Sequence, residues 1–453
     1  MSDGAGGPVP ARGRPGTAPD RTESDRLRTL PSVTIAAQQD PSGSPLVART
    51  TEVADPGPLL ALLPETDPLA WVRHGDGLVG WGVAASCRPT GPDRFAVAEQ
   101  WWDDIVADSV VRDEMGVPGS GLVAFGSFAF ADDPGESWLV VPRVVVGRRH
   151  EGARVRTWVT VVGAGQLPAA EEPVPAPPAA APQGLRYADG ALSGARWAAA
   201  VEDAVRRIGE GKLEKVVLAR DLLAQADAPI DARWPLRRLA DAYPGCWTYC
   251  VDGLVGATPE LLVRRERGLV TSRVLAGTIR RSGDDQHDLA LAGALARSSK
   301  DLEEHEYAVR SVAEALAPHC SSMFVPESPF VLHLPNVMHL ATDVTGVLDD
   351  RSGALGLAAA LHPSAAVGGT PTALALAAIT DLEQMPRGRY AGPVGWIDAA
   401  GDGEWGLALR CGQLDGARVR LFAGCGIVAG SESDAELAEA QAKLVPMRDA
   451  LGG

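Results

Sequence analysis

The hydrophobic and polar positions of this chain alternate with two periods, and these periods predict its elements. Apolar residues that recur every three or four positions predict helices at 96–110, from Trp197 to Ile208, and at 433–451. Runs of β-branched residues bounded by Gly, Pro or Asp predict short strands, and KVVLAR at 215–220 has the pattern of a buried one. Helices and strands occur in mixed order, so we expect an α+β fold with largely antiparallel sheets.

A strand-rich segment follows this buried strand. Its sequence at 246–279, CWTYCVDGLVGATPELLVRRERGLVTSRVLAGTI, places DG and ERG between strand-forming runs, as is typical of an antiparallel meander. Lys215 begins the strand before the meander, and Glu260 follows a proline within it. Lys215 and Glu260 are therefore placed on strands that could be neighbours.

Two segments interrupt the periodic pattern. Residues 1–45 consist largely of Gly, Pro, Ser, Arg and Asp, and they hold too few large apolar side chains to offset the entropy lost on ordering. We predict that they form a disordered N-terminal tail. The Pro/Ala-rich stretch at 165–184 is expected to be extended, either as a linker between domains or as a long surface loop.

Composition and charge narrow the class of protein. Of 453 residues, 45% are hydrophobic, which is enough for a substantial core. The formal net charge of -16 argues against nucleic acid or an anionic membrane as the main partner. No apolar run reaches the ~20 residues of a membrane helix, and the N-terminus lacks the apolar core of a secretory signal, so we expect a cytoplasmic protein. The six cysteines have no zinc-type spacing and are expected to be buried thiols.

Four carboxylates crowd one predicted helix, SSKDLEEHEYAV at 298–309. Asp301 and Glu304 are three residues apart, so they share one face of the helix, and we expect this face to point well away from the apolar stripe. The predicted apolar stripe consists of Leu302, Val309, Ala313 and Leu316. For an isolated acidic pair, a solvated helix face is the simpler explanation.

A second acidic pair begins the last predicted helix. Glu436 and Glu439 are again three residues apart, and they follow the Gly-rich strand end FAGCGIVAG. Two such pairs can supply the hard oxygen ligands that magnesium prefers. Glu436 also has a structural explanation, since SDAE from Ser433 has the pattern of a capping box. The spacing alone leaves both a magnesium site and two solvated helix faces open.

Lys215 and Glu260 are the candidates for acid–base chemistry. A lysine at the end of an apolar strand usually extends its amine into solvent, and a lone Glu after Pro is usually a turn residue. If both side chains face a cleft, burial disfavours the charged form of each, so that one can act as a base and the other as an acid near neutral pH. The Gly-rich VLAGTI and AVGGTP lack the spacing of nucleotide-binding loops.

Between about residues 190 and 450 the chain resembles the chorismate-utilising enzymes, most closely the isochorismate synthases. The resemblance rests on nine blocks in the order of that family: KVVLAR, GATPELL, LAGTIRR, SSKDLEEHEYAV, VMHLATDVTG, LHPSAAVGGTP, GRYAGPVGW, LALRCG and FAGCGIVAGSESDAELAEAQAKL. It implies an anthranilate synthase component I-like fold, with two large, mainly antiparallel sheets packed together and helices outside. It also implies one catalytic domain at 46–453, with 165–184 as a loop within it.

The resemblance implies catalytic and substrate-binding roles. Lys215 matches the base that activates water for attack at carbon 2 of chorismate. Glu260 matches the acid that protonates the hydroxyl leaving carbon 4. Arg410 and Tyr390 match residues that bind the pyruvyl carboxylate, a task suited to a guanidinium. The other positions that match the substrate cleft are Gly277, Thr278, His339, Gly424 and Lys443.

The resemblance also implies a magnesium cofactor, Mg²⁺. Glu304 and Glu439 match its direct ligands, and Asp301 and Glu436 match carboxylates that hold metal-bound waters. The metal would hold the ring carboxylate of the substrate against a protein of net negative charge. One departure concerns the loop at 362–366, which reads HPSAA where the family more commonly has HPTPA.

The alternatives within the family differ in nucleophile and product. Anthranilate and aminodeoxychorismate synthases use ammonia from a glutaminase partner, and the anthranilate enzymes commonly carry Gln at the position of Lys215. The lysine favours water, so we expect no glutaminase subunit. Salicylate synthases share the base, acid and metal site but eliminate pyruvate, and a catalytically silent scaffold on the same fold is the alternative from another class. We expect a monomer whose product feeds menaquinone or catechol siderophore synthesis.

Overall fold

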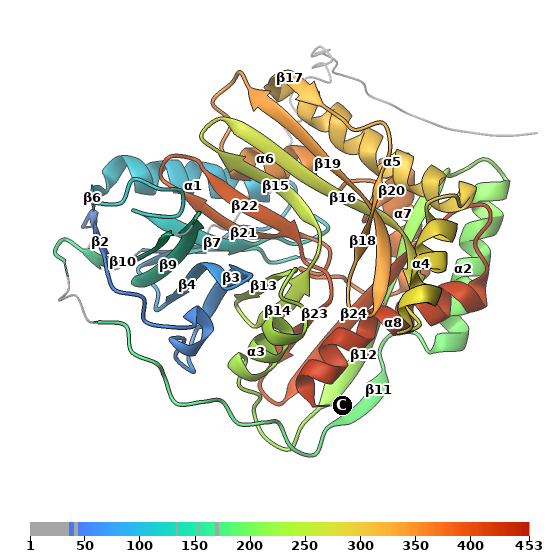
Figure 1. Cartoon of the computed structure of the whole chain (residues 1–453), viewed down its shortest axis with the longest axis horizontal. Coiled ribbons are helices and arrows are strands. Elements are labelled where there is room, and N and C mark those ends of the chain that lie inside the picture. Colours follow the sequence, from blue (N-terminus) through green and yellow to red (C-terminus); the bar gives the residue numbers. More distant parts are fainter. Residues whose placement is uncertain (1–35, 40–43, 133–134, 153, 168–171, 453) are drawn as a thin grey trace, which may run out of the picture. The chain divides into compact units, whose positions relative to one another are not determined.

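Two large β-sheets pack against each other, and helices cover their outer faces (Figure 1). This arrangement confirms the predicted α+β fold with mainly antiparallel sheets, because a single strand pair is parallel among the described residues. The computed structural model describes residues 36–39, 44–132, 135–152, 154–167 and 172–452.

The first sheet has 11 strands within the described residues, and all of its pairings are antiparallel. Its strands are β1 (Ala36–Gln39), β5 (Ala85–Arg88), β7 (Val123–Ser127), β8 (Trp138–Val141), β15 (Leu261–Glu266), β16 (Leu269–Arg280), β17 (Cys320–Phe324), β18 (Phe330–His333), β19 (Val337–Leu348), β21 (Pro393–Asp398) and β22 (Gly403–Leu407). Their order is β1-β5-β8-β7-β21-β22-β15-β16-β19-β17, and β18 also pairs with β19.

The second sheet has 13 strands within the same part of the chain. They are β2 (Leu46–Glu52), β3 (Leu69–Arg73), β4 (Asp76–Trp81), β6 (Val110–Asp113), β9 (Val144–Glu151), β10 (Arg154–Ala164), β11 (Arg186–Asp189), β12 (Lys215–Gln225), β13 (Trp247–Val251), β14 (Leu254–Thr258), β20 (Gly369–Thr370), β23 (Cys411–Asp415) and β24 (Arg418–Ile427). Their order is β11-β12-β24-β23-β14-β13-β3-β4-β9-β10-β2-β6, and β20 also pairs with β12. β2 and β6 form the parallel pair.

Each sheet carries its own set of helices. The first sheet is covered by α1 (Arg94–Asp108), α4 (Asp285–Leu295), α5 (Ser299–Leu316) and α6 (Ala354–Leu361). The second sheet is covered by α2 (Gly194–Gly209), α3 (Arg233–Ala242), α7 (Thr372–Glu383) and α8 (Ser433–Leu451). Short 3-10 helices occur at Leu59–Ala61 and Ala317–His319. Helix α8 also contacts β16, so it spans the two sheets at one end of the space between them.

The predicted helices at 96–110, 197–208 and 433–451 correspond to α1, α2 and α8. Helix α2 buries Trp197, Val201, Ala204 and Ile208, which follow the helical period. The predicted buried strand is β12, whose first seven residues are all buried. Local periodicity thus located these elements correctly.

Helix α5 confirms the helix expected at 298–309, but the prediction of its apolar face is wrong. Its buried residues are His305, Ala308, Val312 and Leu316. Leu302 and Val309 are half-buried instead. His305 enters the core because its Nε2 lies 2.8 Å from Thr342 Oγ1, a hydrogen bond that pattern analysis does not anticipate. The face that carries Asp301 and Glu304 therefore adjoins the buried face.

The predicted meander at 246–279 is divided between the sheets. β13 and β14 belong to the second sheet, whereas β15 and β16 belong to the first. Pro259 and Glu260 form the connection between β14 and β15. Lys215 and Glu260 therefore do not lie on neighbouring strands, since Lys215 begins β12 of the second sheet and Glu260 leads into the first.

Two predicted irregular segments are described only in part. Residues 1–35 and 40–43 of the expected tail lie outside the described residues, so the tail stays a prediction; Ala36–Gln39 form β1, which pairs with β5. Residues 172–184 contain no helix or strand and connect β10 to β11, two strands of one sheet. Arg233 Nη1 donates to the Pro177 carbonyl at 3.1 Å, which ties this loop to the N-terminus of α3.

Buried side chains from both sheets form a large hydrophobic core, and a small second cluster joins α4 to β19 through Ala292, Leu295, Met338 and Leu340. All six cysteines are free thiols, and all but Cys320 are buried, which largely confirms the expectation. Across the part of the chain that the structure describes, no helix combines the length and apolar character needed to span a bilayer.

Candidate active site

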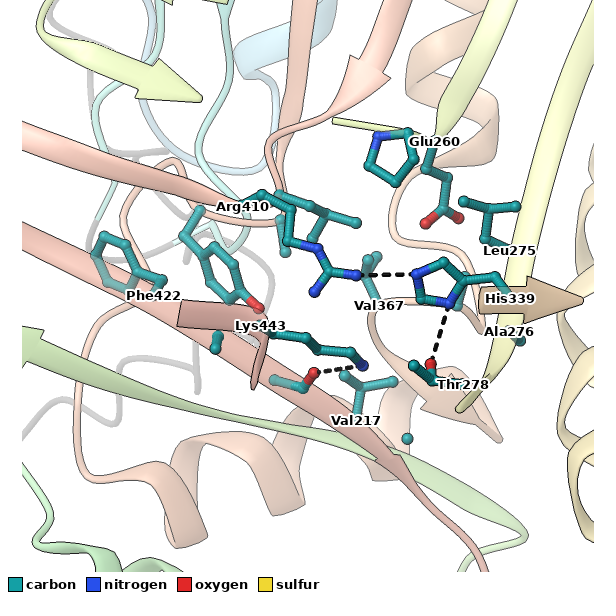
Figure 2. Close-up of a pocket in the computed structure, with 18 of the residues that line it drawn as sticks. Val217, Glu260, Leu275, Ala276, Thr278, His339, Val367, Arg410, Phe422 and Lys443 are labelled. Atoms are coloured by element: carbon teal, nitrogen blue, oxygen red, sulfur yellow. Dashed lines mark hydrogen bonds between the residues drawn. The ribbon is translucent and has the colours of Figure 1, made fainter. Parts of the chain in front are cut away.

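A cavity lies between the two sheets (Figure 2). β12 and β24 supply one wall, β16 and β19 supply another, and α8 contributes Lys443. The residues of its wall that the sequence had singled out are Glu260, Gly277, Thr278, Glu304, His339, Tyr390, Arg410, Gly424 and Lys443. Nine of the predicted site residues thus come together from separate segments, whereas Lys215, Asp301, Glu436 and Glu439 do not line this cavity.

Lys215, at the start of β12, has a fully buried side chain. β12 pairs with β24 so that Val217 lies opposite Gly426. Because Gly426 has no side chain, Glu304 can approach: a Cβ at Gly426 would lie 2.0 Å from Glu304 Oε1 and 3.1 Å from Lys215 Cε. Lys215 Nζ lies 3.3 Å from Glu304 Oε1, yet it has no hydrogen-bond partner among the described residues. This buried amine therefore retains bonding capacity for a water or a substrate.

Glu260 brings a buried carboxyl to the other side of the cavity. Its side chain reaches the cavity from the connection between the sheets (Figure 2), and the residue is 6% exposed. Its backbone N–H donates to Thr258 Oγ1 at 3.2 Å, which stabilises this turn. Burial raises the pKa of Glu260 to about 8, although the positive charge of Lys215 opposes the shift. The carboxyl therefore holds its proton at neutral pH and can donate it.

A β-bulge in β16 shapes the wall beside α5. The register of β16 shifts between Ala276 and Thr278, and Gly277 has φ +76. A Cβ at Gly277 would lie 2.9 Å from the Cβ of Asp301. Glycine is required here for both reasons: the backbone is left-handed, and α5 packs closely against it.

A chain of hydrogen bonds crosses the cavity (Figure 2). Arg410 Nη2 donates to His339 Nε2 at 3.0 Å, so the ring proton lies on Nδ1, which donates to Thr278 Oγ1 at 3.1 Å. Burial and the charge of Arg410 lower the pKa of His339, and the ring is neutral. The histidine thus lies in the cavity and orients the guanidinium of Arg410.

Tyr390 and Lys443 hold two further groups in place. The ring of Tyr390 stacks on Phe422, with centroids 5.0 Å apart, and burial raises the pKa of its phenol, which stays protonated. Lys443 Nζ donates to the Gly424 carbonyl at 3.0 Å and lies 2.5 Å from Glu439 Oε1. Burial is the largest single influence and lowers the pKa of Lys443, but the charge and hydrogen bond of Glu439, together with Cys425, raise the pKa above its usual value. Both groups can therefore donate to an anionic ligand.

The two acidic pairs lie on α5 and α8. Lys300 Nζ donates to Glu436 Oε1 at 2.8 Å, and the carboxylates of Glu304 and Asp301 lie close enough to attract the same ammonium. Carboxylate oxygens of Glu436 and Glu439 come within 4.8 Å of each other. The group of possible ligands that lie within 4.8 Å of one another contains Glu436 and Glu439 but neither Asp301 nor Glu304, so a metal site shared by all four carboxylates stays a prediction.

The donor set of this cluster fits a hard divalent cation. Carboxylate oxygens are the ligands that Mg²⁺ prefers, and Gly426 leaves space beside Glu304. The Sγ of Cys425 lies within the same group of atoms as Glu436 and Glu439. Burial raises the pKa of this thiol well above its usual value, so it stays neutral and donates to the Glu436 carbonyl at 3.3 Å. Cys425 is thus not a thiolate ligand.

The capping box that offered an alternative explanation of Glu436 is not formed at the start of α8. The N-cap is Glu432, and no side chain forms the capping hydrogen bond. Ser433 lies inside the helix, and its hydroxyl donates to Glu202 Oε1 at 3.1 Å. Glu436 bonds to Lys300 and not to the N-cap residue, so helix capping does not explain the presence of this carboxylate.

Arg387 is a cavity residue that sequence reasoning missed. It pairs with Glu383 at 2.5 Å, and its Nη1 and Nη2 donate to the carbonyls of Val367 and Val217, each at 2.8 Å. An arginine in PRGRY carries no sequence signal for burial. Gly426 was detectable, since GCGIV places glycines at alternate positions of a strand, on one face.

In the loop where the sequence departs from the family pattern, Ala366 and Val367 line the cavity. Ser364 and Ala365 are buried, and the backbone N–H of Ala365 donates to Ser311 Oγ at 3.3 Å. The backbone of Ala365, one of the two substituted positions, therefore connects the loop to α5. The next two residues, Ala366 and Val367, form part of the cavity wall.

Comparisons with known proteins agree on one family. Residues 69–452 match the family described as "Chorismate binding enzyme". The isochorismate synthase MenF of Bacillus subtilis (strain 168) is 36% identical over 362 residues, which cover 74% of this chain and 75% of that protein. The solved structure of DhbC from Bacillus anthracis has a TM-score of 0.72 at 30% identity, covering 87% of this chain and 98% of the other. The solved structure of anthranilate synthase component I from Streptococcus pneumoniae TIGR4 confirms the predicted fold. Its TM-score is 0.64 at 21% identity, and the match covers 84% of this chain and 92% of that chain.

Proposed function

The chain belongs to the chorismate-binding enzymes, and we propose that it is a magnesium-dependent isochorismate synthase, an isomerase that interconverts chorismate and isochorismate. The observation that carries the proposal is a buried, protonated Glu260 in the wall of the cavity, together with the buried amine of Lys215, which lies 3.3 Å from Glu304 of the same wall. An acid and a base at separate positions suit an exchange of hydroxyl groups at two carbons of one ring.

The substrate would be oriented by its two carboxylates. Arg410 and Tyr390 are suited to the pyruvyl carboxylate, because the guanidinium is held by His339 and the phenol is protonated. Gly277, Thr278, Gly424 and Lys443 would complete the substrate-binding wall. Fixing both ends of the substrate keeps the ring between the acid and the base.

Four carboxylates would hold the magnesium ion. Glu304 and Glu439 would bind it directly, and Asp301 and Glu436 would hold its water ligands. When bound, Mg²⁺ supplies the positive charge that binds the ring carboxylate in a protein with a net charge of -16.

Lys215 and Glu260 would carry the proton transfers. Lys215 would accept a proton from the water whose oxygen bonds to carbon 2, and the ring double bonds shift. Glu260 gives its proton to the hydroxyl that leaves carbon 4 as water. One water is consumed and one is released, so the product is an isomer of the substrate, and solvent returns the two residues to their starting states.

The choice of nucleophile follows from the same residue. Lys215 activates water, and we propose that the enzyme acts as a cytoplasmic monomer without a glutaminase subunit. The product would be isochorismate, which both menaquinone and catechol siderophore synthesis consume.

The test is product analysis with chorismate and Mg²⁺ in water enriched in ¹⁸O. We expect a mixture of chorismate and isochorismate with the label at carbon 2 of isochorismate, and we expect folded Lys215→Ala to lose about 100- to 10,000-fold in turnover. Salicylate and pyruvate in equal amounts would assign the protein to the salicylate synthases. Unlabelled isochorismate would contradict water attack, and no consumption of chorismate would contradict the whole proposal.

A further inference from the structure

Lysine is rare in this chain and is concentrated at the carboxylate cluster. Only four of the 42 lysine and arginine residues are lysines. Three of the four lysines pair with carboxylates of the proposed magnesium site. Lys215 lies 3.3 Å from Glu304, Lys300 lies 2.8 Å from Glu436, and Lys443 lies 2.5 Å from Glu439. The fourth, Lys212, pairs with Glu210 on the surface. Such a concentration indicates that an ammonium, and not a guanidinium, is needed at this site.

The three ammonium groups differ in how freely they can leave the cluster. The side chain of Lys215 is 0% exposed, and that of Lys443 is 14% exposed and also bonded to the Gly424 carbonyl. The side chain of Lys300 is 37% exposed. Of the three, Lys300 is therefore the one that can rotate into solvent without breaking the wall of the cavity.

We propose that Lys300 is a displaceable internal cation, which neutralises Glu436 in the metal-free protein and competes with the magnesium ion for this carboxylate. The inference rests on the metal site of the proposed function. When a divalent cation binds, the ammonium of Lys300 moves into solvent and Glu436 turns to the waters of the metal. Lys300 thereby lowers the affinity of the site and allows the metal to exchange.

Electrostatics gives the reason for such a cation. The carboxylates of Glu436 and Glu439 lie within 4.8 Å of each other, and like charges so close repel strongly where water is largely excluded. Lys300 lies where it is attracted by Glu436, Glu304 and Asp301 at once, so a single charge relieves several repulsions. A divalent cation at the centre of the cluster does the same task with twice the charge.

The use of lysine instead of arginine supports displacement. A guanidinium holds a carboxylate through two parallel hydrogen bonds, whereas an ammonium is a compact point charge on a flexible stem. Arg387, which pairs with Glu383 deep in the fold, shows how this chain builds a permanent ion pair. The Lys300–Glu436 pair uses the weaker geometry, as a reversible contact requires.

The test measures metal binding without substrate. Full-length protein is stripped with chelator and titrated with MgCl₂ in a calorimeter, as wild type and as Lys300→Met, Lys300→Gln and Lys300→Arg. We expect Lys300→Met and Lys300→Gln to bind Mg²⁺ about two- to fivefold more tightly, the factor that a half-exposed ion pair supplies. Lys300→Arg should bind it more weakly than wild type, and the surface control Lys212→Met should match wild type.

A second readout is the thermal unfolding midpoint in chelator and in Mg²⁺. Lys300→Met should have a lower midpoint in chelator and a larger increase with Mg²⁺ than wild type, because ligand binding to the folded state raises the midpoint. Unchanged or weaker Mg²⁺ binding by both Lys300→Met and Lys300→Gln, with wild type binding normally, would overturn the inference alone. Failure of the wild type to bind Mg²⁺ would overturn the proposed metal site and the inference with it.

Discussion

At the scale of single residues, burial decides the chemistry of Glu260. A carboxyl of ordinary pKa is ionised at neutral pH and cannot protonate a leaving group. Pro259 places Glu260 at the point where the chain passes from one sheet to the other, and both sheets exclude water from it. The nearby Lys215, Lys443 and Arg410 limit the resulting rise of the pKa but do not cancel it.

We predict that kcat/KM falls as the pH rises through about 8. Glu260 must hold its proton in the free enzyme, and its pKa of about 8 sets the point at which that proton is lost. Glu260→Gln should lower kcat by about 100- to 10,000-fold and remove this pH dependence from the residual rate. The measurement is a pH–rate profile from pH 6 to 10, with circular dichroism to verify folding. A flat profile between pH 7 and 9 would contradict the role of Glu260.

Gly426 shows how a missing side chain positions two others. We predict that Gly426→Ala weakens Mg²⁺ binding by about 10- to 100-fold, the range found for residues that orient metal ligands. The added Cβ would lie 2.0 Å from Glu304 Oε1 and would push this carboxylate away from the cluster. Calorimetric titration measures the loss. Gly430→Ala is the matched control, because no atom lies within 4 Å of its added Cβ.

At the scale of elements, a buried ion pair joins α7 to β12. Glu383, in the last turn of α7, accepts from the Ala219 N–H of β12 at 2.7 Å and pairs with Arg387 at 2.5 Å. Burial raises the pKa of Glu383, and Arg387 opposes the shift. Arg387 in turn bonds Val217, two residues from Lys215. The pair therefore fixes the strand that carries the proposed base.

We predict that Glu383→Gln lowers the free energy of unfolding by about 3–5 kcal/mol, because it leaves the buried charge of Arg387 uncompensated. Urea denaturation measures this loss. Glu210→Gln removes one carboxylate from an exposed pair with Arg206 and should leave the urea midpoint unchanged. Equal midpoints for Glu383→Gln and wild type would show that the pair does not stabilise the fold.

At the scale of the whole molecule, charge supports the proposed metal. The net charge of -16 and the neighbouring carboxylates of Glu436 and Glu439 would repel a dicarboxylate such as the proposed substrate. Arg410 and Lys443 supply positive charge at the cavity, but Lys443 is already paired with Glu439. A bound cation would offset this repulsion and is therefore part of the proposed function.

We predict that excess chelator abolishes turnover of chorismate and that added Mg²⁺ restores it. The measurement is the initial rate in chelator and after a titration with MgCl₂. Raising ionic strength with NaCl is the control, because monovalent salt screens charge without occupying the cluster. Undiminished turnover in chelator would remove the metal from the mechanism, and full activity of Glu304→Ala would show that Glu304 is not a ligand.

The sequence by itself determined the elements and the family. Helices α2 and α8 and strand β12 were predictable because their signals are local: the spacing of apolar side chains and the turn residues lie within or beside each segment. The candidate acid, base and carboxylates were predictable too, because the ordered motifs that contain them are readable without coordinates.

The tertiary structure alone decided which residues act together, because burial and ion pairing join positions far apart in the chain. It assigned β14 and β15 to different sheets, rotated α5 so that His305 is buried, and buried Glu260 enough to raise its pKa to about 8. Lys300 and Glu436 are separated by 136 residues, and no local pattern links them. Such contacts depend on the packing of the two sheets and their helices, which no single segment of the sequence encodes.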